Sequence, residues 1–248
     1  MVKVLYEDVH IIVVDKPAGV ESQSARGFQA DMVSRIRTHI HKFSTMNPAK
    51  SPKGQPPYVG VIHRLDKPVR GVMVYAKSQK AAAVLSAQVQ KGEMGKIYAA
   101  VVCGKPVDNC GQYVDFLLKD GQNGGSKIVD KSVDGGKEAR LNYRVLGQAK
   151  WESGAAPEGG LEVSLLDIEL LTGRYHQIRA QMAGHGTPIF GDNRYGNRGD
   201  GGKQAPLALC ARKLSFLHPA TGERLEFEVR PEGGAFDLFG EVWEKLEG

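Results

Sequence analysis

The chain has 248 residues, of which 41% are hydrophobic and 25% charged, and this composition is typical of a soluble globular protein with a sizeable core. Its net charge of +5 suits an anionic partner such as nucleic acid without requiring one. The three cysteines lack CxxC spacing, which argues against a disulfide framework and a cysteine metal site. No apolar run is long enough for a membrane span and the N-terminus lacks a signal-peptide pattern, so we expect a cytoplasmic protein.

The first part of the chain is expected to alternate short strands with two helices. The first twenty residues predict two strands around a turn, and the second strand, HIIVVD, ends at Asp15 before Lys16-Pro17-Ala18-Gly19 breaks the pattern. Because Lys16 follows a buried strand, it could reach a phosphate; a solvated loop lysine is the alternative. Helical spacing of apolar residues predicts helices over 31–43 and 80–91, the second between a Ser78 N-cap and Gly92.

The stretch 59–78 (VGVIHRLDKPVRGVMVYAKS) lies between these helices and holds a dense group of charges. Two short apolar runs predict strands joined by a loop. That loop holds one carboxylate, Asp66, and four basic side chains: His63, Arg64, Lys67 and Arg70. Opposite charges nearby favour the ionised form of Asp66, which is then usable as a nucleophile or a base. From this loop alone, a structural ion pair is an equal alternative.

The second part of the chain is richer in strands. Strands are predicted over 96–103, 114–119, 137–146, 161–171, 206–216 and 225–229. Tyr98 is the one large polar-tipped residue of the first of these, and a core tyrosine is its default interpretation. The glycine-rich segment 121–136 is expected to form an exposed hairpin or a lobe that orders on binding.

A second polar cluster, TGRYHQIRAQMAGHGTPIFGDNRYG, follows the strand 161–171. Gly173 is expected to supply a tight turn before a helix over 176–183, on which His176 and Arg179 share one face and Ile178 lies on another. A last helix is predicted over 238–246. Since no internal repeat or clear linker occurs, we expect one domain over 1–248.

Several familiar motifs are missing from the sequence. It contains no GxxxxGK[ST] phosphate loop, no HExxH and no GxSxG, and its GxG-like strings lack a strand–turn–helix context. A dinucleotide cofactor is therefore not expected. The chain offers instead a carboxylate in an arginine-rich loop, a tyrosine on a strand and an arginine on a short helix.

Four blocks of sequence, in order and spanning about residues 5–232, resemble the RluA family of pseudouridine synthases. They are HRLDKPVRG with the upstream VDKPAGV, then KIYAAVV, the polar cluster TGRYHQIRAQMAGHGTPIFGDNRYG, and ARKLSFLHPATGERLEFEVRP. The resemblance implies an α+β fold, with a mixed, largely antiparallel β-sheet, flanking helices and a central catalytic cleft. It also implies isomerisation of uridine in RNA, with no cofactor and no metal.

The resemblance assigns roles by position. Asp66 corresponds to the catalytic aspartate, Tyr98 to the tyrosine that stacks on uracil and takes part in proton transfer, and Arg179 to the basic partner of the aspartate. Arg64 corresponds to the arginine that replaces the flipped nucleotide, and Ile178 to an apolar residue of the base pocket. We expect further substrate contacts from His63, Arg174, His176 and Lys16.

The chemistry of the reaction is consistent with these roles. A glycosidase needs a second carboxyl group to manage water, whereas here the base never leaves, so one carboxylate at the sugar could suffice. Attack at C1′ and proton abstraction from C2′ both remain open. The nucleotide must be flipped out of its stack, which calls for a side chain to fill the gap. A buried Asp66 would need a cationic partner, and Arg179 is expected to supply it.

Two positions depart from the family pattern. Val69-Arg70 stands where Thr-Ser is frequent, and Tyr175 stands where Thr is common. Arg70 is expected either to add a phosphate contact or to be a neutral surface change. Neither departure removes a proposed catalytic group.

The partner implied is structured RNA, a ribosomal or transfer RNA stem-loop in which a uridine is easily unstacked. The first strand begins almost at Met1, so no N-terminal RNA-binding module is expected. RNA contacts are then expected from the lysines of 42–55, a loop-rich segment, and of 119–137, with Arg194 and Arg198. We expect a monomer with no obligate protein partner and no membrane association.

Two alternatives from other classes remain. A non-catalytic RNA-binding or RNA-folding factor could keep the fold without turnover, although the set Asp66, Tyr98 and Arg179 speaks against it. A purely structural domain, in which these charges only form ion pairs, is disfavoured by the four ordered blocks.

Overall fold

The computed structural model describes residues 2–24, 30–46, 56–121, 124–152, 159–196 and 205–247. The chain divides into two compact units. Unit 1 comprises Met1–Gly95 and Lys213–Val229, and unit 2 comprises Lys96–Arg212 and Arg230–Gly248. The expectation of one domain over 1–248 stays a prediction. The α+β class is confirmed, with antiparallel strand pairing in both units.

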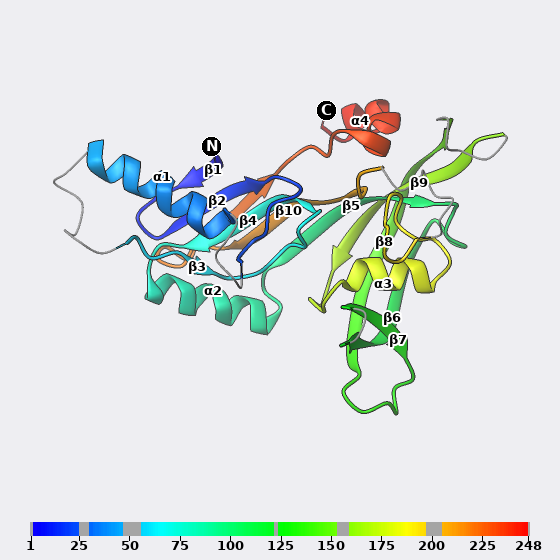
Figure 1. Ribbon diagram of the computed structural model, residues 1–248, viewed down its shortest axis with the longest axis horizontal. Helices are drawn as coiled ribbons and strands as arrows, with labels where there is room; N and C mark the ends of the chain where they lie inside the picture. The colour runs from blue at the N-terminus through cyan, green and yellow to red at the C-terminus, as the bar shows by residue number, and fades with distance from the viewer. Residues whose placement is uncertain are drawn as a thin grey trace. The chain divides into compact units, whose positions relative to one another are not determined.

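Unit 1 is built around short antiparallel strands with two helices (Figure 1). Its strand order is β1-β2-β4-β10, with β3 on β4 and β11 on β10. The strands are β1 (Lys3–Glu7), β2 (Ile11–Lys16), β3 (Gly60–Val61), β4 (Arg70–Ala76), β11 (Arg224–Glu228) and the second part of β10 (Leu209–Leu217). The helices are α1 (Met32–Met46) and α2 (Gln79–Lys91).

The core of unit 1 follows from two apolar strands. Every residue of β2 is buried, as are all but the first of β4, which is typical of strands covered on both faces. Their antiparallel register places Lys16 opposite Gly71, so the end of β2 lies beside the start of β4. Helix α2 runs along β3 and β4 and is capped as predicted, by the Ser78 side chain and by Gly92 in the left-handed conformation.

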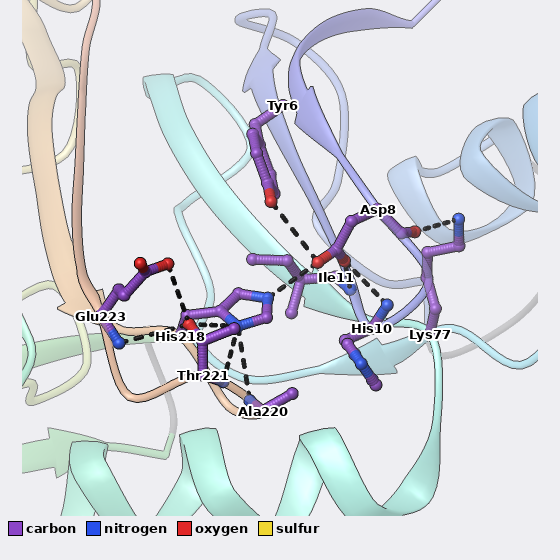
Figure 2. A network of polar contacts seen from close by, with 9 residues as sticks. All are labelled: Tyr6, Asp8, His10, Ile11, Lys77, His218, Ala220, Thr221 and Glu223. Atoms are coloured by element: carbon purple, nitrogen blue, oxygen red, sulfur yellow. Dashed lines mark hydrogen bonds and ion pairs between the residues drawn. The ribbon is translucent and has the colours of Figure 1, made fainter.

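A partly buried polar network joins two turns of unit 1 (Figure 2). The Asp8 carboxylate accepts hydrogen bonds from the main-chain N–H groups of His10 (2.7 Å) and Ile11 (2.8 Å), and it lies 2.8 Å from Nε2 of His218. His218 Nδ1 accepts from the Thr221 N–H at 3.1 Å, so Nε2 carries the proton that His218 donates to Asp8. The network ties the β1–β2 turn to the β10–β11 turn and explains the histidine in the block LHPATG.

In its described residues, unit 2 contains antiparallel strands in the order β5-β9-β8-β6-β7, with the first part of β10 (through Arg212) beside β5. The strands are β5 (Gly95–Cys103), β6 (Cys110–Asp120), β7 (Gly125–Val129), β8 (Lys137–Trp151) and β9 (Leu161–Leu170). The helical elements are α3 (Gln177–Gly184), the 3₁₀ helix η2 (Gly234–Phe239) and α4 (Gly240–Glu247). Helix α3 lies beside β6 and β7 (Figure 1), where Ala180 packs on Leu117 and Ala139.

Most predicted elements are present, with different lengths. Strand β8 continues past 146 because a bulge at Val145–Gly147 lets it keep pairing with β9. The glycine-rich segment 121–136 was expected to form a hairpin or a lobe; it contributes one strand, β7, whose hairpin partner β6 lies before the segment. The tail helix α4 begins at Gly240, two residues later than predicted, and the 3₁₀ helix η2 directly precedes it. Much of the loop 44–58 lies outside the described residues. In the described part of the chain, no helix is long and apolar enough to cross a membrane.

Candidate active site

The loop that carries Asp66 is fixed on both sides within unit 1. The Ser22 hydroxyl donates to the Leu65 carbonyl at 2.9 Å and accepts from the Leu65 N–H at 3.0 Å, and Ser22 is buried. On the other side of Asp66, the Lys67 carbonyl accepts from the Gly19 N–H at 2.8 Å. The half-buried Asp66 therefore stands on a backbone that the segment after β2 holds in place.

Lys16 contributes to the same anchoring. It is fully buried, and its ammonium donates to three main-chain carbonyls, those of Val20 (2.7 Å), Pro17 (3.0 Å) and Lys67 (3.3 Å). Burial lowers the pKa of Lys16 to about 8, although the negative charges of Asp66 and Asp15 act in the opposite direction. The predicted phosphate contact would need an exposed ammonium, whereas this ammonium stabilises the turn next to Asp66.

Arg70, one of the two departures from the family pattern, forms an internal ion pair. Its guanidinium donates to both carboxylate oxygens of Asp15, from Nε at 3.2 Å and from Nη2 at 2.8 Å. Asp15 is buried and also lies 3.1 Å from the Lys3 ammonium. Since Arg70 compensates a buried carboxylate, neither a neutral surface change nor a dedicated phosphate contact describes it well.

His63 and Arg64 precede Asp66 in the loop. His63 is half-buried, and its Nε2 accepts from the Val74 N–H at 3.3 Å, which orients the ring against β4. Arg64 is exposed. The substrate contacts predicted for both residues stay predictions.

Tyr98 and Ile178 belong to unit 2 and are both buried. Tyr98 lies in β5, opposite Ile168 of β9, with 8% of its surface exposed. Ile178 lies in the first turn of α3 and is 5% exposed. Their roles at the base stay predictions.

Arg179 is held by a carboxylate that the sequence interpretation did not single out. Its Nε and Nη2 donate to the two oxygens of Asp192 at 2.7 and 2.8 Å, and both side chains are buried. Main-chain N–H groups of Arg194 (2.9 Å) and Tyr195 (3.2 Å) donate to the same carboxylate. The pairing of Arg179 with Asp66 stays a prediction.

These contacts determine the charge state of Asp192. Burial raises its pKa, but the hydrogen bonds and the charge of Arg179, with the N–H groups of Arg194 and Tyr195, lower it by more. The pKa of Asp192 is therefore below the usual range, and the pair is ionic at neutral pH.

The residues before Arg179 are held against β8. The Oε1 of Gln177 accepts hydrogen bonds from the Thr172 hydroxyl (2.8 Å) and the Arg174 N–H (3.0 Å). Its Nε2 donates to the Arg140 carbonyl (3.1 Å). The exposed Arg174 donates from Nε to the Glu138 carbonyl at 2.8 Å. The Arg174 side chain is thereby bonded to the main chain near the start of β8.

His176 is the N-cap of α3 and adopts the left-handed conformation, with φ of 51°. It is the one non-glycine residue with positive φ in the described ranges. Its side chain makes no capping hydrogen bond but lies 3.4 Å from Arg179, from Nε2 to Nη1.

The predicted site residues thus fall in both units: His63, Arg64, Asp66 and Lys16 in unit 1, and the others in unit 2. Within unit 2, His176, Ile178 and Arg179 come together on α3. Sequence reasoning missed Ser22 and Asp192. Asp192 is the one carboxylate in the second polar cluster, and a carboxylate so near a candidate catalytic arginine was an available signal.

No group of three or more histidine, cysteine, aspartate or glutamate side chains is placed to bind a metal ion in the ranges that the structure describes. Of the three cysteines, Cys103 and Cys210 are buried and Cys110 is exposed.

The fold is that of RNA pseudouridylate synthases. The solved structure named Human RNA Pseudouridylate Synthase Domain Containing 4 matches with a TM-score of 0.70 and 23% identity, over 99% of this chain and 93% of that chain. Human RNA Pseudouridylate Synthase Domain Containing 1 also gives a TM-score of 0.70, at 20% identity, over 93% of this chain and 83% of that chain.

The sequence places the chain in the same class. The sequence model of the family described as RNA pseudouridylate synthase matches residues 10–184. Ribosomal large subunit pseudouridine synthase D of Pseudomonas aeruginosa is 33% identical over 91% of this chain and 67% of that protein. The tRNA pseudouridine synthase C of Pectobacterium carotovorum is 31% identical over 97% of this chain and 62% of that protein. The chain belongs to the RNA pseudouridylate synthase family, of the RluA type, and is an RNA pseudouridine synthase.

Proposed function

We propose that this enzyme converts specific uridines to pseudouridine in structured regions of ribosomal or transfer RNA. The names of two relatives support this substrate class, since one refers to the large ribosomal subunit and the other to tRNA. The alternative of a non-catalytic RNA-binding factor is not favoured by these relatives.

The observation that carries the assignment of the catalytic residue is the anchoring of the Asp66 loop. A nucleophile or base must be held within a fraction of an ångström of its productive position. Ser22, Gly19 and Lys16 bond the main chain on both sides of Asp66, so its carboxylate stands on a fixed support. In the proposal, Asp66 acts at the ribose of a flipped nucleotide, by attack at C1′ or by taking a proton from C2′.

The other roles are part of the same proposal. Tyr98 stacks on the uracil and takes part in proton transfer, Arg179 supplies positive charge near the reacting carboxylate, and Ile178 lines the base pocket. Arg64, which is exposed, fills the space that the flipped nucleotide leaves.

Phosphate contacts in the proposal come from exposed basic side chains. Lys119, Lys127 and Lys131 of the β6–β7 region are exposed, and Lys42 is exposed on α1. Of the other residues predicted for this purpose, Arg198 and the lysines in 47–55 lie outside the described residues. The expectations of a monomer, of no obligate protein partner and of a cytoplasmic location stay predictions.

The test measures tritium release from cellular RNA labelled with [5-³H]uridine. Wild-type protein is compared with Asp66→Asn, which keeps the side-chain shape and removes the charge, and with Asp66→Ala. We expect release with wild type and none above background with either variant, while RNA binding is retained.

Each possible outcome decides a separate part of the proposal. Binding of RNA without release by wild type would favour the non-catalytic factor. Release by Asp66→Asn at the wild-type rate would show that another residue is the catalytic carboxylate. Mapping of modified positions in RNA from cells that lack the protein would then distinguish ribosomal from transfer RNA.

A further inference from the structure

A chain of side-chain contacts in unit 2 leads from Arg179 to the β6–β7 hairpin. The Nη1 of Arg179 lies 3.4 Å from Nε2 of His176, and Nδ1 of His176 lies 3.0 Å from the hydroxyl oxygen of Tyr195. The same oxygen accepts the main-chain N–H of Ser126, the second residue of β7, at 2.7 Å. Arg179 and the hairpin are thus separated by two side chains.

The chemistry of Arg179 and Ser126, at the two ends of this series of contacts, determines which atoms donate and which accept. A guanidinium can only donate, so His176 Nε2, which faces it, must be an acceptor without a proton. The ring proton of neutral His176 therefore lies on Nδ1 and is donated to the Tyr195 oxygen, which also accepts from Ser126. A proton on Nε2 would point at a fixed positive charge.

Tyr195 also supports Arg179 directly. The guanidinium carbon lies 5.3 Å from the centroid of the Tyr195 ring, and the His176 ring meets that ring edge-on, with centroids 5.7 Å apart. With Asp192 holding Nε and Nη2, the side chains around Arg179 in unit 2 leave its plane little freedom to turn.

The backbone of His176 shows that this placement of its ring has a cost. A left-handed conformation in a non-glycine residue is strained and persists where the surroundings impose it. The ring is stacked on Tyr175 at 4.0 Å and bonded to Tyr195, so contacts on two sides hold it beside Arg179.

A second tyrosine, Tyr175, bonds to the same hairpin, but its hydroxyl bonds to Gly124 rather than to His176. The Tyr175 hydroxyl donates to the Gly124 carbonyl at 3.2 Å, and the Tyr175 main-chain carbonyl accepts from the Ser126 hydroxyl at 2.6 Å. The hydroxyls of Tyr175 and Tyr195 therefore both bond to the hairpin, but only that of Tyr195 also meets His176. This difference gives a matched pair for experiment.

We propose that Tyr195 is a positioning residue for the reaction: its phenol oxygen holds His176 as the Nδ1–H tautomer, and His176 in turn orients Arg179. The proposal deepens the proposed function and rests on it, because Arg179 is taken to act on the uridine. It adds that the β6–β7 hairpin is part of this support, since Ser126 fixes the oxygen that His176 needs.

The test compares Tyr195→Phe with Tyr175→Phe in single-turnover pseudouridine formation on an RNA that wild type modifies. Tyr195→Phe keeps the ring beneath Arg179 but leaves Ser126 N–H and His176 Nδ1–H without their acceptor. We expect its rate constant at saturating RNA to fall about tenfold or more, because small displacements of a catalytic group have large effects on rate, while the half-saturating RNA concentration changes less than about threefold. Tyr175→Phe is expected to keep the wild-type rate constant.

Equal losses of rate in both variants would overturn the proposal and favour general docking of the hairpin. A loss confined to RNA binding, or an unchanged rate in Tyr195→Phe, would also overturn it. The nitrogen chemical shifts of His176 in the wild-type protein give a measurement that needs no variant. A protonated Nδ1 and an unprotonated Nε2 are expected at neutral pH, and a proton on Nε2 would refute the proposal even if Tyr195→Phe fails to fold. A wild-type protein without activity on any RNA would instead count against the proposed function, and the tautomer would still be measured.

Discussion

Lys16 and Arg179 are both buried cations, but different groups compensate their charges. The ammonium of Lys16 bonds to three carbonyl dipoles, whereas the guanidinium of Arg179 bonds to both oxygens of the Asp192 carboxylate. A dipole offsets the cost of burying a charge less completely than an opposite charge does. Burial therefore lowers the pKa of Lys16, while the ion pair lowers the pKa of Asp192, and the two groups affect stability at opposite ends of the pH range.

Replacement of Arg179 by alanine is expected to lower the free energy of unfolding at pH 7 by about 3–5 kcal/mol, because the buried carboxylate of Asp192 loses its partner. The pKa of Asp192 is lowered by folding, so this contribution is present above the unfolded value of about 4 and is lost as the pH falls through the folded value. Urea denaturation at pH 7 and pH 3 should show the difference between wild type and variant shrinking in acid.

The control for this prediction is Lys213→Ala. Lys213 pairs with Glu226 and Glu228, whose side chains are about half exposed, so its loss should change stability at pH 7 by less than about 1 kcal/mol. A similarly small effect of Arg179→Ala would contradict the buried ion pair as a source of stability.

In wild type, the free energy of unfolding is expected to rise with pH in the alkaline range because of Lys16. Replacement of Lys16 by methionine is expected to remove this rise. Between the folded pKa of about 8 and the usual value of 10.5, the unfolded chain binds more protons at this residue than the folded chain. The free energy of unfolding of wild type should therefore rise over this window, by up to about 3 kcal/mol from Lys16 alone.

Urea denaturation at intervals from pH 7.5 to 10.5 measures this rise. Lys16→Met should lack the contribution, whereas Lys3→Met, which changes a side chain that is 65% exposed, should keep it. The same slope in wild type and Lys16→Met would show that the ammonium is not destabilised by its burial.

At the scale of elements, those with local signals could be predicted and those that depend on pairing could not. Helix α2 has an N-cap serine, apolar residues at helical spacing and a terminal glycine, and its predicted bounds differ from the observed bounds by one residue. Strand β8 is five residues longer than predicted because its register with β9 continues through a bulge. No local sequence pattern in β8 indicates that it pairs with β9. Likewise, η2 before α4 reflects packing of Phe239 against β8 at Gly147.

Two glycines of the second polar cluster should respond differently to replacement by alanine. Gly191 has φ of 74°, and a Cβ there would lie 2.9 Å from the Ala205 carbonyl oxygen and closer still to the Pro206 carbonyl. Gly191→Ala is expected to cost at least about 2 kcal/mol and to displace the neighbouring Asp192. Gly173, expected from its sequence context to supply a tight turn, has no positive φ and open space around its Cβ position.

Thermal unfolding and single-turnover activity of the two variants test this contrast. Gly191→Ala should lose both stability and rate, whereas Gly173→Ala should keep both. Loss of function in Gly173→Ala alone would indicate that the turn, and not the segment that holds Asp192, sets the position of α3.

At the scale of the whole molecule, candidate site residues could be named from the sequence, whereas the residues that support them could not. Asp66 and Arg179 could be named as candidates because each lies in a dense local cluster with a recognisable block around it, and their catalytic roles stay predictions. Ser22 acts on Leu65 from 43 residues away, and Tyr195 acts on Ser126 from 69 residues away. Such contacts depend on how distant segments pack, and a single sequence contains no direct signal for them.

The basic character of the molecule leads to a prediction about RNA binding. Each lysine that neutralises a phosphate releases counterions, so its removal should reduce the slope of log affinity against log salt by about 0.7–0.9. Lys127 and Lys131 are exposed on and after β7, whereas Lys119 lies 5.2 Å from the Tyr175 ring and is less suited to replacement. The double variant Lys127→Gln, Lys131→Gln should therefore bind the substrate RNA more weakly. Its slope of log affinity against log salt should be smaller than that of wild type by about 1.5.

Affinity measured between 50 and 300 mM KCl, together with the rate constant at saturating RNA, tests this prediction. Because phosphate contacts position RNA without taking part in the chemistry, the rate constant of the double variant should equal that of wild type. Lys213→Gln, in which the replaced ammonium already pairs with Glu226 and Glu228, should keep the wild-type slope. An unchanged slope in the double variant would place the phosphate contacts on another surface, and a lower rate constant at saturation would mean that the hairpin contributes to the chemistry through more than its support of Tyr195.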